Sequence, residues 1–399
     1  MATAAPEKAL PAEHLIGGTL PAGPVRIDTT AVHGGERPDP QDGAVNTRIV
    51  QSTTYHYPEM PDGSPSRHIY SRYDNPTVEA VEAKLAALEG CDGALAFASG
   101  MAAIQAVCMA FLRPGDALAI QRGVYGGTTA YVRDELEPMG VHVHVFDAEG
   151  PRAFPSNVRL VWMESITNPL LRVPDIEAWA HAAHDVGARL CVDATFATPV
   201  VQRPMRWGAD LVMHSGTKYL GGHSDVTCGF VCHRAGDRER LWTRRRNLGA
   251  TLDPLAAYLA GRGMKTLGLR MARHQENAAA LAKACTKLAK VQAVHYPGLP
   301  EHPDHERARR LLTGFGGMVT IDLGSLEAAQ AFRRKVRLIT PAASLGGVES
   351  LLSLPVETSH AYASPESRAA DGITDGLVRI SVGVEDVADL VADVEAALA

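Results

Sequence analysis

Leu211 to Asp225 reads LVMHSGTKYLGGHSD, and this stretch decides how the rest of the chain is interpreted. It begins as an apolar run that suits a short buried strand, and two glycines near its end mark a turn. Lys218 lies after the apolar run and before the two glycines, and the hydroxyl side chains of Ser215 and Thr217 come just before it. A lysine where a buried strand ends is costly unless it is paired, neutralised or used covalently. The hydroxyls could bind a phosphate. The same sequence is also compatible with a strand end, a solvated lysine and a turn that bind no ligand.

A second apolar run, residues 189–192, ends in Asp193, and the chain between Asp193 and Lys218 is long enough for one loop or crossover. Pyridoxal phosphate (PLP) needs both residue types. A lysine forms a Schiff base with its aldehyde, and a carboxylate keeps its ring nitrogen protonated so that the ring can act as an electron sink. Together with the hydroxyls before Lys218, this pair predicts a PLP site.

Three longer motifs resemble the cystathionine γ-synthase and γ-lyase family, which is the Cys/Met-metabolism group of PLP enzymes. They are VDATFATP at 192–199, GADLVMHSGTKYLGGHSD at 208–225 and SLGGVESL at 344–351, and the resemblance runs from about Thr30 to the C-terminus. It implies a fold-type I, aminotransferase-like α/β fold with a large parallel-sheet cofactor domain and a smaller C-terminal α/β domain. We expect an N-terminal arm at 1–69, the PLP-binding domain at 70–265 and the small domain at 266–399.

The resemblance also implies roles for individual residues. Lys218, Tyr125 and Asp193 are expected to be catalytic, with Tyr125 stacking on the cofactor ring and acting as a proton donor. The expected cofactor-binding residues are Tyr70, Arg72, Gly100, Met101, Tyr125, Asn168, Asp193, Ser215, Thr217 and Lys218. Substrate binding is assigned to Ser344 and to Arg379, which would hold the α-carboxylate.

Elementary chemistry agrees with several of these roles. An arginine such as Arg72 suits a phosphate through bidentate, charge-assisted bonds, and the resemblance places Tyr70 and Arg72 on the cofactor of a neighbouring subunit. A helix that starts at Ser99-Gly100 would offer backbone N–H groups to an anion. Without the resemblance, Arg379 would be interpreted as an exposed strand arginine, and Tyr125 as a turn residue before two glycines.

Hydrophobic periodicity predicts strands alternating with helices, and hence a mostly parallel sheet with the ligand groups at the carboxyl ends of its strands. Expected strands cover 94–98, 116–121, 141–146, 158–163, 189–193 and 209–213, and in the small domain 317–322 and 377–382. Expected helices cover 78–88, 176–186, 254–264, 267–288, 326–336 and 387–398, with Thr77 as a cap of the first.

The implied reaction is γ-elimination on methionine or cystathionine, giving 2-oxobutanoate, ammonia and a thiol. A γ-replacement synthase that uses an activated homoserine is the alternative, and a catalytically inactive scaffold is a third. Ala194 stands where the family usually has asparagine, and Gly127 where methionine γ-lyases typically carry cysteine. Ile69 and Ala343 occupy places where cystathionine-using members commonly have acidic residues.

The resemblance implies a small amino-acid substrate and a homotetramer of two catalytic dimers as the partners, and the composition weighs against other classes of partner. The 399 residues carry a net charge of −6 and a pI of about 6.2, which argues against nucleic-acid or anionic-membrane surfaces. Residues 244–246, three arginines, are interpreted as a solvated helix face. The six cysteines form no zinc pattern, so no metal is expected, and they fit a reducing cytoplasm. Residues 1–24 lack the pattern of a secretory signal, and no apolar run reaches the roughly 20 residues of a membrane helix.

Overall fold

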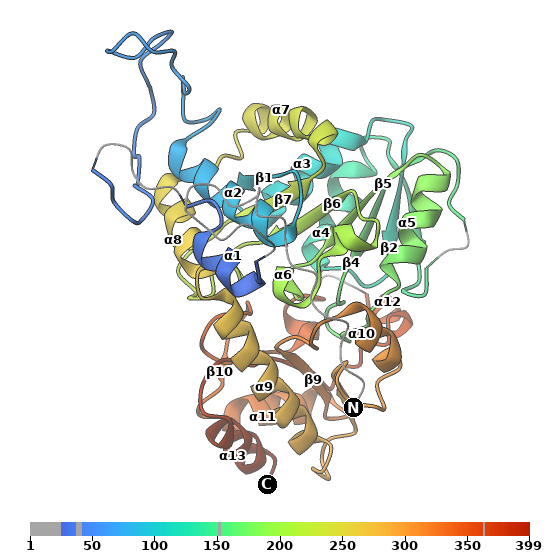
Figure 1. The fold of residues 1–399 in the computed structure, drawn as a ribbon. Coiled ribbons are helices and arrows are strands. Elements are labelled where there is room, and N and C mark those ends of the chain that lie inside the picture. Colours follow the sequence, from blue (N-terminus) through green and yellow to red (C-terminus); the bar gives the residue numbers. More distant parts are fainter. Residues whose placement is uncertain (1–24, 37–41, 151–152, 362–363) are drawn as a thin grey trace. The chain divides into compact units, whose positions relative to one another are not determined.

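The computed structural model describes residues 25–36, 42–150, 153–361 and 364–399 (Figure 1). The predictions for residues 1–24 lie outside the described residues. The chain forms two compact units. We call the described residues within 25–111 and 210–268 the lysine unit, because they contain Lys218, and those within 112–209 and 269–399 the aspartate unit, because they contain Asp193. The predicted boundaries at residues 69 and 265 stay a prediction.

In the lysine unit, β7 (Gly229–His233) pairs with β1 (Gly93–Phe97) on one side and β6 (Leu211–Ser215) on the other. Both pairings are antiparallel, so this part of the structure departs from the parallel arrangement that the sequence predicted. The reason is the short connection from β6 to β7, which contains Lys218 but no crossover helix. All five residues of β7 are buried, as expected for a strand covered on both faces.

Five helices belong largely to this unit: α1 (Ile27–His33), α2 (Pro76–Glu89), α3 (Gly100–Phe111), α7 (Arg238–Leu248) and α8 (Pro254–Met264). The predicted cap of α2 was wrong by two residues, because Asn75 rather than Thr77 holds that place. The Asn75 side chain accepts hydrogen bonds from the backbone N–H groups of Thr77 and Val78, and Pro76 occupies the first helical position. The apolar side chains of Val81, Leu85 and Leu88 are buried, and α2 packs against α1 and α8.

The basic run at 244–246 lies on α7, and its interpretation as a solvated face was wrong for Arg245. This guanidinium is 2% exposed and is hydrogen-bonded to the carboxylates of Glu82 and Asp74. Because acidic partners come from a helix and a loop far away in the sequence, the run itself gave no sign of the burial. Arg245 thereby joins α7 to α2 within the lysine unit.

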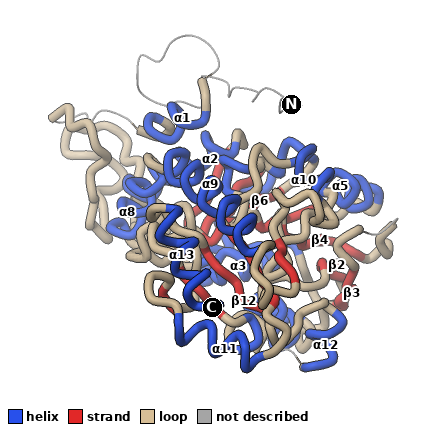
Figure 2. The backbone as a smooth tube through the Cα atoms, turned by 90° about the horizontal axis from the view of Figure 1, so that it is seen from below, coloured by secondary structure: helices blue, strands red, loops and turns tan. Residues whose placement is uncertain are grey.

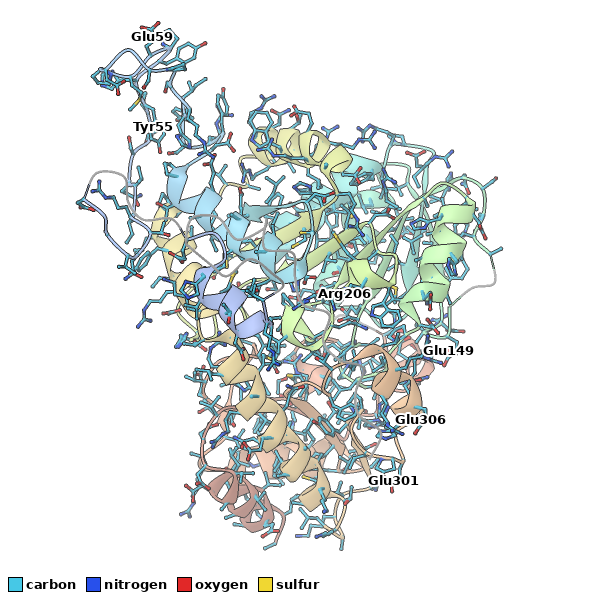
Figure 3. All side chains as sticks on the ribbon, viewed as in Figure 1. Tyr55, Glu59, Glu149, Arg206, Glu301 and Glu306 are labelled. Atoms are coloured by element: carbon cyan, nitrogen blue, oxygen red, sulfur yellow. The ribbon has the colours of Figure 1, made fainter. Side chains whose placement is uncertain are left out.

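Residues 42–75 form a long loop of the lysine unit, drawn in tan in Figure 2. Two isolated bridges, Thr54 to Tyr70 and Glu59 to Pro65, hold its two limbs together. Figure 3 shows Tyr55 and Glu59 along this loop, which extends beyond α2. Large apolar side chains on it are exposed, including Tyr57, Met60 and Ile69. This part of the predicted arm therefore makes little core of its own.

The first sheet region of the aspartate unit is parallel, as predicted. Its strand order is β5 (Arg189–Asp193), β4 (Val158–Glu164), β2 (Ala117–Gln121) and β3 (His142–Phe146). Glu164 and Asp193 lie opposite each other in the register of β4 and β5, at the carboxyl ends of both strands. Helix α5 (Ile176–Asp185), capped by Asp175, connects these two strands. Two carboxyl groups are therefore placed side by side where parallel sheets bind ligands.

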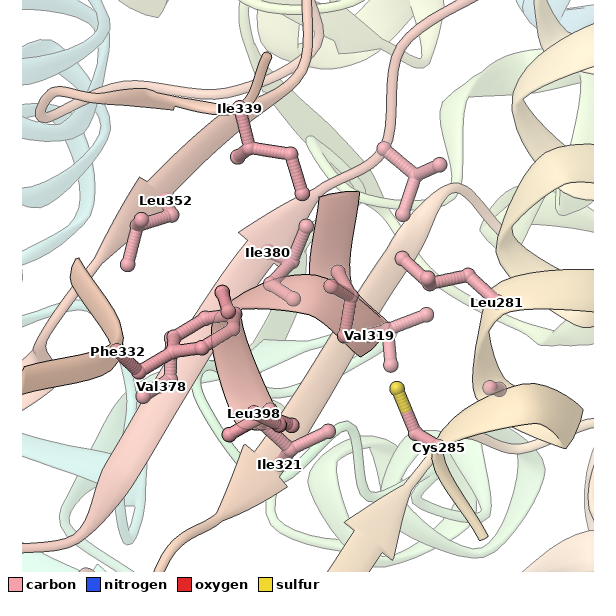
Figure 4. Close-up of a cluster of buried hydrophobic side chains, with 14 of the residues drawn as sticks. Leu281, Cys285, Val319, Ile321, Phe332, Ile339, Leu352, Val378, Ile380 and Leu398 are labelled. Carbon is pink, nitrogen blue, oxygen red and sulfur yellow. The ribbon is translucent and has the colours of Figure 1, made fainter. Parts of the chain in front are cut away.

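A second sheet of this unit has the order β10 (Thr340–Pro341), β11 (Leu351–Ser353), β12 (Leu377–Ser381), β9 (Met318–Asp322) and β8 (Ala293–His295). Three helices contribute to its core: α9 (Leu267–Cys285), α11 (Leu326–Lys335) and α13 (Val387–Leu398). Figure 4 shows the contact, with Leu281 and Cys285 of α9 and Phe332 of α11 facing Val319 and Ile380. The predicted strands and helices are present, although α9 ends three residues early.

The remaining helical segments are short: α4 (Gly126–Tyr131), α6 (Thr198–Val201), α10 (His305–Leu311), α12 (Pro365–Ala370), and single turns at Val132–Leu136, Pro204–Trp207, Ala235–Asp237 and Pro355–Glu357. Within the described ranges, no helix combines the length and apolarity that a membrane crossing requires. The same residues contain no group of three or more potential metal ligands.

Candidate active site

Lys218 lies in a tight turn after β6. Its backbone N–H donates to the Ser215 carbonyl at 3.2 Å, and its own carbonyl accepts from the Gly222 N–H at 2.8 Å. The Thr217 hydroxyl accepts from the Cys228 N–H at 3.0 Å and donates to the Cys228 carbonyl at 3.2 Å. Thr217 therefore ties the turn to the segment before β7, a structural task that the sequence did not suggest.

Beside this turn, the backbone of Gly100 at the start of α3 comes close to the Ser215 side chain. A Cβ atom added to Gly100 would lie 3.0 Å from Ser215 Oγ and 3.1 Å from Ser215 Cβ. The Ser99 hydroxyl accepts from the Ala102 N–H at 3.1 Å and caps the helix, with Met101 in its first turn. The structure thus brings together Gly100 and Ser215, two of the residues expected to bind the cofactor. Free N–H groups at the start of a twelve-residue helix and a serine hydroxyl suit a phosphate.

Asp193 closes β5 in the aspartate unit with only 9% of its surface exposed. Its Oδ1 atom accepts a hydrogen bond from the Thr195 N–H at 3.0 Å, which fixes the carboxylate at the strand end. Ala194, the residue that departs from the family pattern, is fully buried and contributes no polar side-chain group. The local geometry that the sequence predicted for Asp193 is therefore present.

Glu164 is a residue of this site that the sequence analysis missed. Its carboxyl oxygens accept the backbone N–H groups of Tyr125, at 2.6 Å, and Asn168, at 3.1 Å. It is 6% exposed, and burial raises its pKa well above the usual range, with the negative charge of Asp193 adding to the effect. The sequence could have indicated this residue, because Glu164 follows the apolar run 158–163 in the same way that Asp193 follows the apolar run 189–192. Glu164 holds two predicted cofactor residues in one frame.

Arg379 extends this frame toward the second sheet of the aspartate unit. Its Nη1 atom donates to Asn168 Oδ1 at 3.0 Å, and its Nη2 atom donates to the Ser344 carbonyl at 3.1 Å. Only 6% of Arg379 is exposed, so it is not the exposed strand arginine of the alternative interpretation. Because the Asn168 side-chain oxygen accepts the hydrogen bond from Arg379, the NH₂ group of Asn168 remains to donate to a ligand. The Tyr125 side chain is 43% exposed and precedes α4.

Tyr70 and Arg72 lie on the surface of the lysine unit. The Arg72 guanidinium sits 5.5 Å from the Tyr70 ring centroid and 5.0 Å from that of Tyr73. Its Nη1 atom donates to the Arg246 carbonyl at 3.3 Å. These contacts hold the exposed guanidinium over two tyrosine rings of its own loop and beside the end of α7.

A family model described as Cys/Met metabolism PLP-dependent enzyme matches residues 28–399. The chain belongs to this family. Cystathionine γ-synthase of Mycobacterium tuberculosis is 44% identical over 93% of this chain and 96% of its own. Cystathionine γ-lyase of Bacillus subtilis is 43% identical, covering 93% and 98%, and L-methionine γ-lyase of Pseudomonas putida is 40% identical, covering 93% and 96%. The crystal structure of metB from Corynebacterium glutamicum superposes with a TM-score of 0.90 at 40% identity, covering 94% of this chain and 98% of the other.

Membership of the Cys/Met-metabolism family confirms two predictions, the PLP cofactor and the fold-type I α/β fold. The residues of the chain fit this cofactor. The cradle at Gly100 and Ser215 has no room for a larger side chain and offers donors for a phosphate. Buried Asp193 is a suitable acceptor for a protonated ring nitrogen.

Proposed function

We propose that this family member is a γ-lyase, which eliminates the γ-substituent of methionine or cystathionine as a thiol and consumes one water to release 2-oxobutanoate and ammonia. PLP supplies an electron sink for the negative charge that develops at the substrate α-carbon. Arg379 binds the α-carboxylate and orients the substrate. Lys218 carries the cofactor and, once released, takes the α-proton, while Asp193 keeps the ring nitrogen protonated. Tyr125 donates a proton to the departing sulfur.

The frame around Glu164 supports these roles for Tyr125, Asn168 and Arg379. One carboxyl group fixes the backbone of Tyr125 and Asn168, and the Asn168 side chain binds Arg379. One hydrogen-bonded network thereby holds Tyr125, which we propose stacks on the cofactor ring, Asn168, which by the resemblance would bind the cofactor 3-hydroxyl oxygen, and Arg379, which we propose binds the substrate. Such preorganisation favours a single substrate orientation.

We further propose that the enzyme prefers a substrate with an uncharged γ-substituent, such as methionine, and this proposal rests on Ile69 and Ala343. Ile69 is 45% exposed and Ala343 is also exposed, so both can present an apolar surface to a ligand. Neither can pair with the charged distal end of cystathionine. Desolvating such a group without a partner costs several kcal/mol, whereas an apolar wall favours a methyl thioether by roughly 1–3 kcal/mol.

Replacing both residues by acids tests this preference. The ratio of kcat/KM for cystathionine to that for methionine should rise by up to roughly thirtyfold in Ile69→Glu/Ala343→Glu, because two exposed ion pairs contribute about 1 kcal/mol each. Steady-state kinetics on both substrates measures the ratio, and Ile69→Gln/Ala343→Gln controls for polarity without charge. An unchanged ratio in the acidic variant contradicts the proposed role of these positions.

A γ-replacement synthase is the second candidate, supported by the 44% identity to cystathionine γ-synthase of Mycobacterium tuberculosis. The crystal structure of cystathionine γ-synthase from Xanthomonas oryzae in complex with cystathionine has a TM-score of 0.90 at 39% identity, covering 94% and 98% of the two chains. Gly127, where methionine γ-lyases carry cysteine, also weighs against strict methionine specificity. Incubation with methionine, with cystathionine, and with an O-acylhomoserine plus cysteine separates the candidates. A γ-lyase yields 2-oxobutanoate from the first two, and a synthase yields thioether from the third.

We also place the enzyme in the cytoplasm as a homotetramer of two catalytic dimers. The six cysteines are all buried and none forms a disulfide, which supports a reducing compartment. The exposed apolar side chains of loop 42–75 support burial of this loop against a second copy. In such a dimer, Tyr70 and Arg72 bind the phosphate of the partner subunit's cofactor.

Subunit mixing tests this assignment. Lys218→Ala and Arg72→Ala subunits should each be nearly inactive alone, but a mixed dimer contains one site in which Lys218 and Arg72 are both intact. Activity should therefore reappear after the two variants are unfolded and reassembled together, in proportion to the mixed dimers measured by native mass spectrometry. Mixed dimers without activity would show that Arg72 serves its own subunit.

A further inference from the structure

The lysine unit contains a cavity of about 330 Å³ that the proposed reaction does not use. Helix α2 lines it with residues Thr77 to Lys84, α8 with Ala257 to Arg262, and the chain after α1 with Glu36. None of the predicted cofactor residues of the unit is part of its wall. Its volume lies at the small end of the range for metabolite sites, roughly 300–1,000 Å³.

Three cationic side chains, Lys84, Arg262 and Lys265, line this cavity together with a single carboxylate, that of Glu36. Glu36 Oε1 lies 3.2 Å from the ammonium groups of both Lys84 and Lys265. The Glu36 pKa is lowered, because attraction by these two lysines outweighs the effect of burial, and the group is a carboxylate at neutral pH. One negative charge is thus shared by two lysines, and the wall keeps a surplus of positive charge.

Lys84 is the buried part of this cluster. It is 2% exposed, and burial lowers its pKa to about 8 although Glu36 opposes the shift. Its ammonium also donates to the carbonyls of Ala31, at 2.9 Å, and Val32, at 3.3 Å. Lys84 therefore has its full set of three acceptors and serves to fix Glu36.

The cationic groups that can bind a ligand lie within α8 and just after its end. Arg262 is exposed, and no carboxylate of the described residues lies within ion-pair distance of it. Lys265 is 27% exposed and donates to Asn46 Oδ1 at 3.0 Å as well as to Glu36, which leaves one of its three N–H donors. The polar wall also includes the Tyr258 side chain, the His223 ring and three threonines, while Val81 and Ala257 are buried and apolar.

We propose that this cavity binds a small dianion, either a dicarboxylate or a phosphate ester, between Arg262 and Lys265. A guanidinium binds a carboxylate or phosphate through two parallel hydrogen bonds, and Lys265 can bind the second charge. Val81 and Ala257 would contact the short carbon chain between the charges. One small carbon skeleton with two oxyanion charges fits both the volume and the surplus of positive charge.

Ligand binding here would reach the turn that holds Lys218. His223 lines the cavity, and its Nδ1 atom lies 2.9 Å from the Gly221 carbonyl within that turn. Helix α8 touches the same carbonyl, because a Cβ atom on Gly263 would lie only 2.2 Å from Gly221 O. A dianion bound by Arg262 and Lys265 would therefore lie beside two groups, His223 and Gly263 of α8, that contact this turn.

Isothermal titration of the PLP-loaded enzyme tests the proposal, since bound PLP already fills the phosphate cradle at Gly100. Succinate and inorganic phosphate serve as dianion probes, and acetate as a monoanion. We expect succinate or phosphate to bind at least tenfold more tightly than acetate, and the better of the two identifies the oxyanion. Arg262→Gln/Lys265→Gln should weaken that binding at least tenfold, and Gly261→Leu, which places a side chain in the cavity wall, should remove it.

A matched control removes one arginine charge and one lysine charge far from the cavity in the sequence. Lys287→Gln/Arg334→Gln changes exposed residues of the aspartate unit and should bind the dianion like the parent enzyme. All variants are compared at equal ionic strength and only as PLP-loaded protein, judged by the visible absorption of the cofactor. Failure of both dianions to bind at millimolar concentration overturns the proposal, and so does binding that persists unchanged in both Arg262→Gln/Lys265→Gln and Gly261→Leu.

Discussion

Replacing Lys218 with alanine should abolish covalent attachment of PLP and reduce turnover by several orders of magnitude. The lysine has two proposed tasks, and proton transfer alone is worth about 10²–10⁴-fold. The fold should survive, because the turn is held by backbone bonds of Lys218 and by the hydroxyl of Thr217, which alanine at position 218 leaves in place.

Borohydride reduction followed by mass spectrometry measures the covalent link directly. The parent enzyme should yield one modified peptide that contains Lys218, and the variant should yield none. Lys283→Ala, which removes an exposed lysine of α9, is the matched control and should retain both the modified peptide and the activity. Cofactor trapped covalently in Lys218→Ala would assign the link to another lysine.

The parts of the structure that the sequence predicted well are those with local causes. The strand before Lys218 and the strand before Asp193 are continuous apolar runs, and each ends within two residues of the predicted position. Gly100 was expected to allow a close approach, and its partner Ser215 is itself a motif residue. In these cases the residue pattern and the final contact concern the same short segments.

The features that were missed depend on partners far apart in the sequence. Arg245 looked like a surface residue until α2 and the preceding loop brought Glu82 and Asp74 to it. Arg379 was recognisable only through the resemblance, because its partners Asn168 and Ser344 come from other segments. Local sequence periodicity does not reveal these partners, because the sequence around an arginine is the same whether or not a distant segment packs against it in the fold.

Replacing Asp193 should have the second largest effect, and two variants separate its charge from its structural bond. Asp193→Asn retains an oxygen for the Thr195 N–H but loses the negative charge, whereas Asp193→Ala loses both. Removing the partner of a buried, charged hydrogen bond costs about 2–5 kcal/mol, which corresponds to roughly 30- to several-thousand-fold. We therefore expect weaker PLP binding and slower α-proton exchange in both variants, with the asparagine variant the more stable of the two.

Glu164 decides how this result is interpreted, because it is the nearest candidate to replace the lost carboxylate. Burial and the charge of Asp193 both raise the Glu164 pKa, so removing Asp193 lowers that pKa and leaves Glu164 more ionised at a given pH. Its two oxygens nevertheless remain bonded to the N–H groups of Tyr125 and Asn168 and cannot turn toward the cofactor without releasing both. Proton exchange at the substrate α-carbon, followed by NMR in D₂O at saturating PLP, should therefore stay slow in Asp193→Asn across the pH range. Exchange at the parent rate with full cofactor occupancy would show that Asp193 does not control the ring nitrogen.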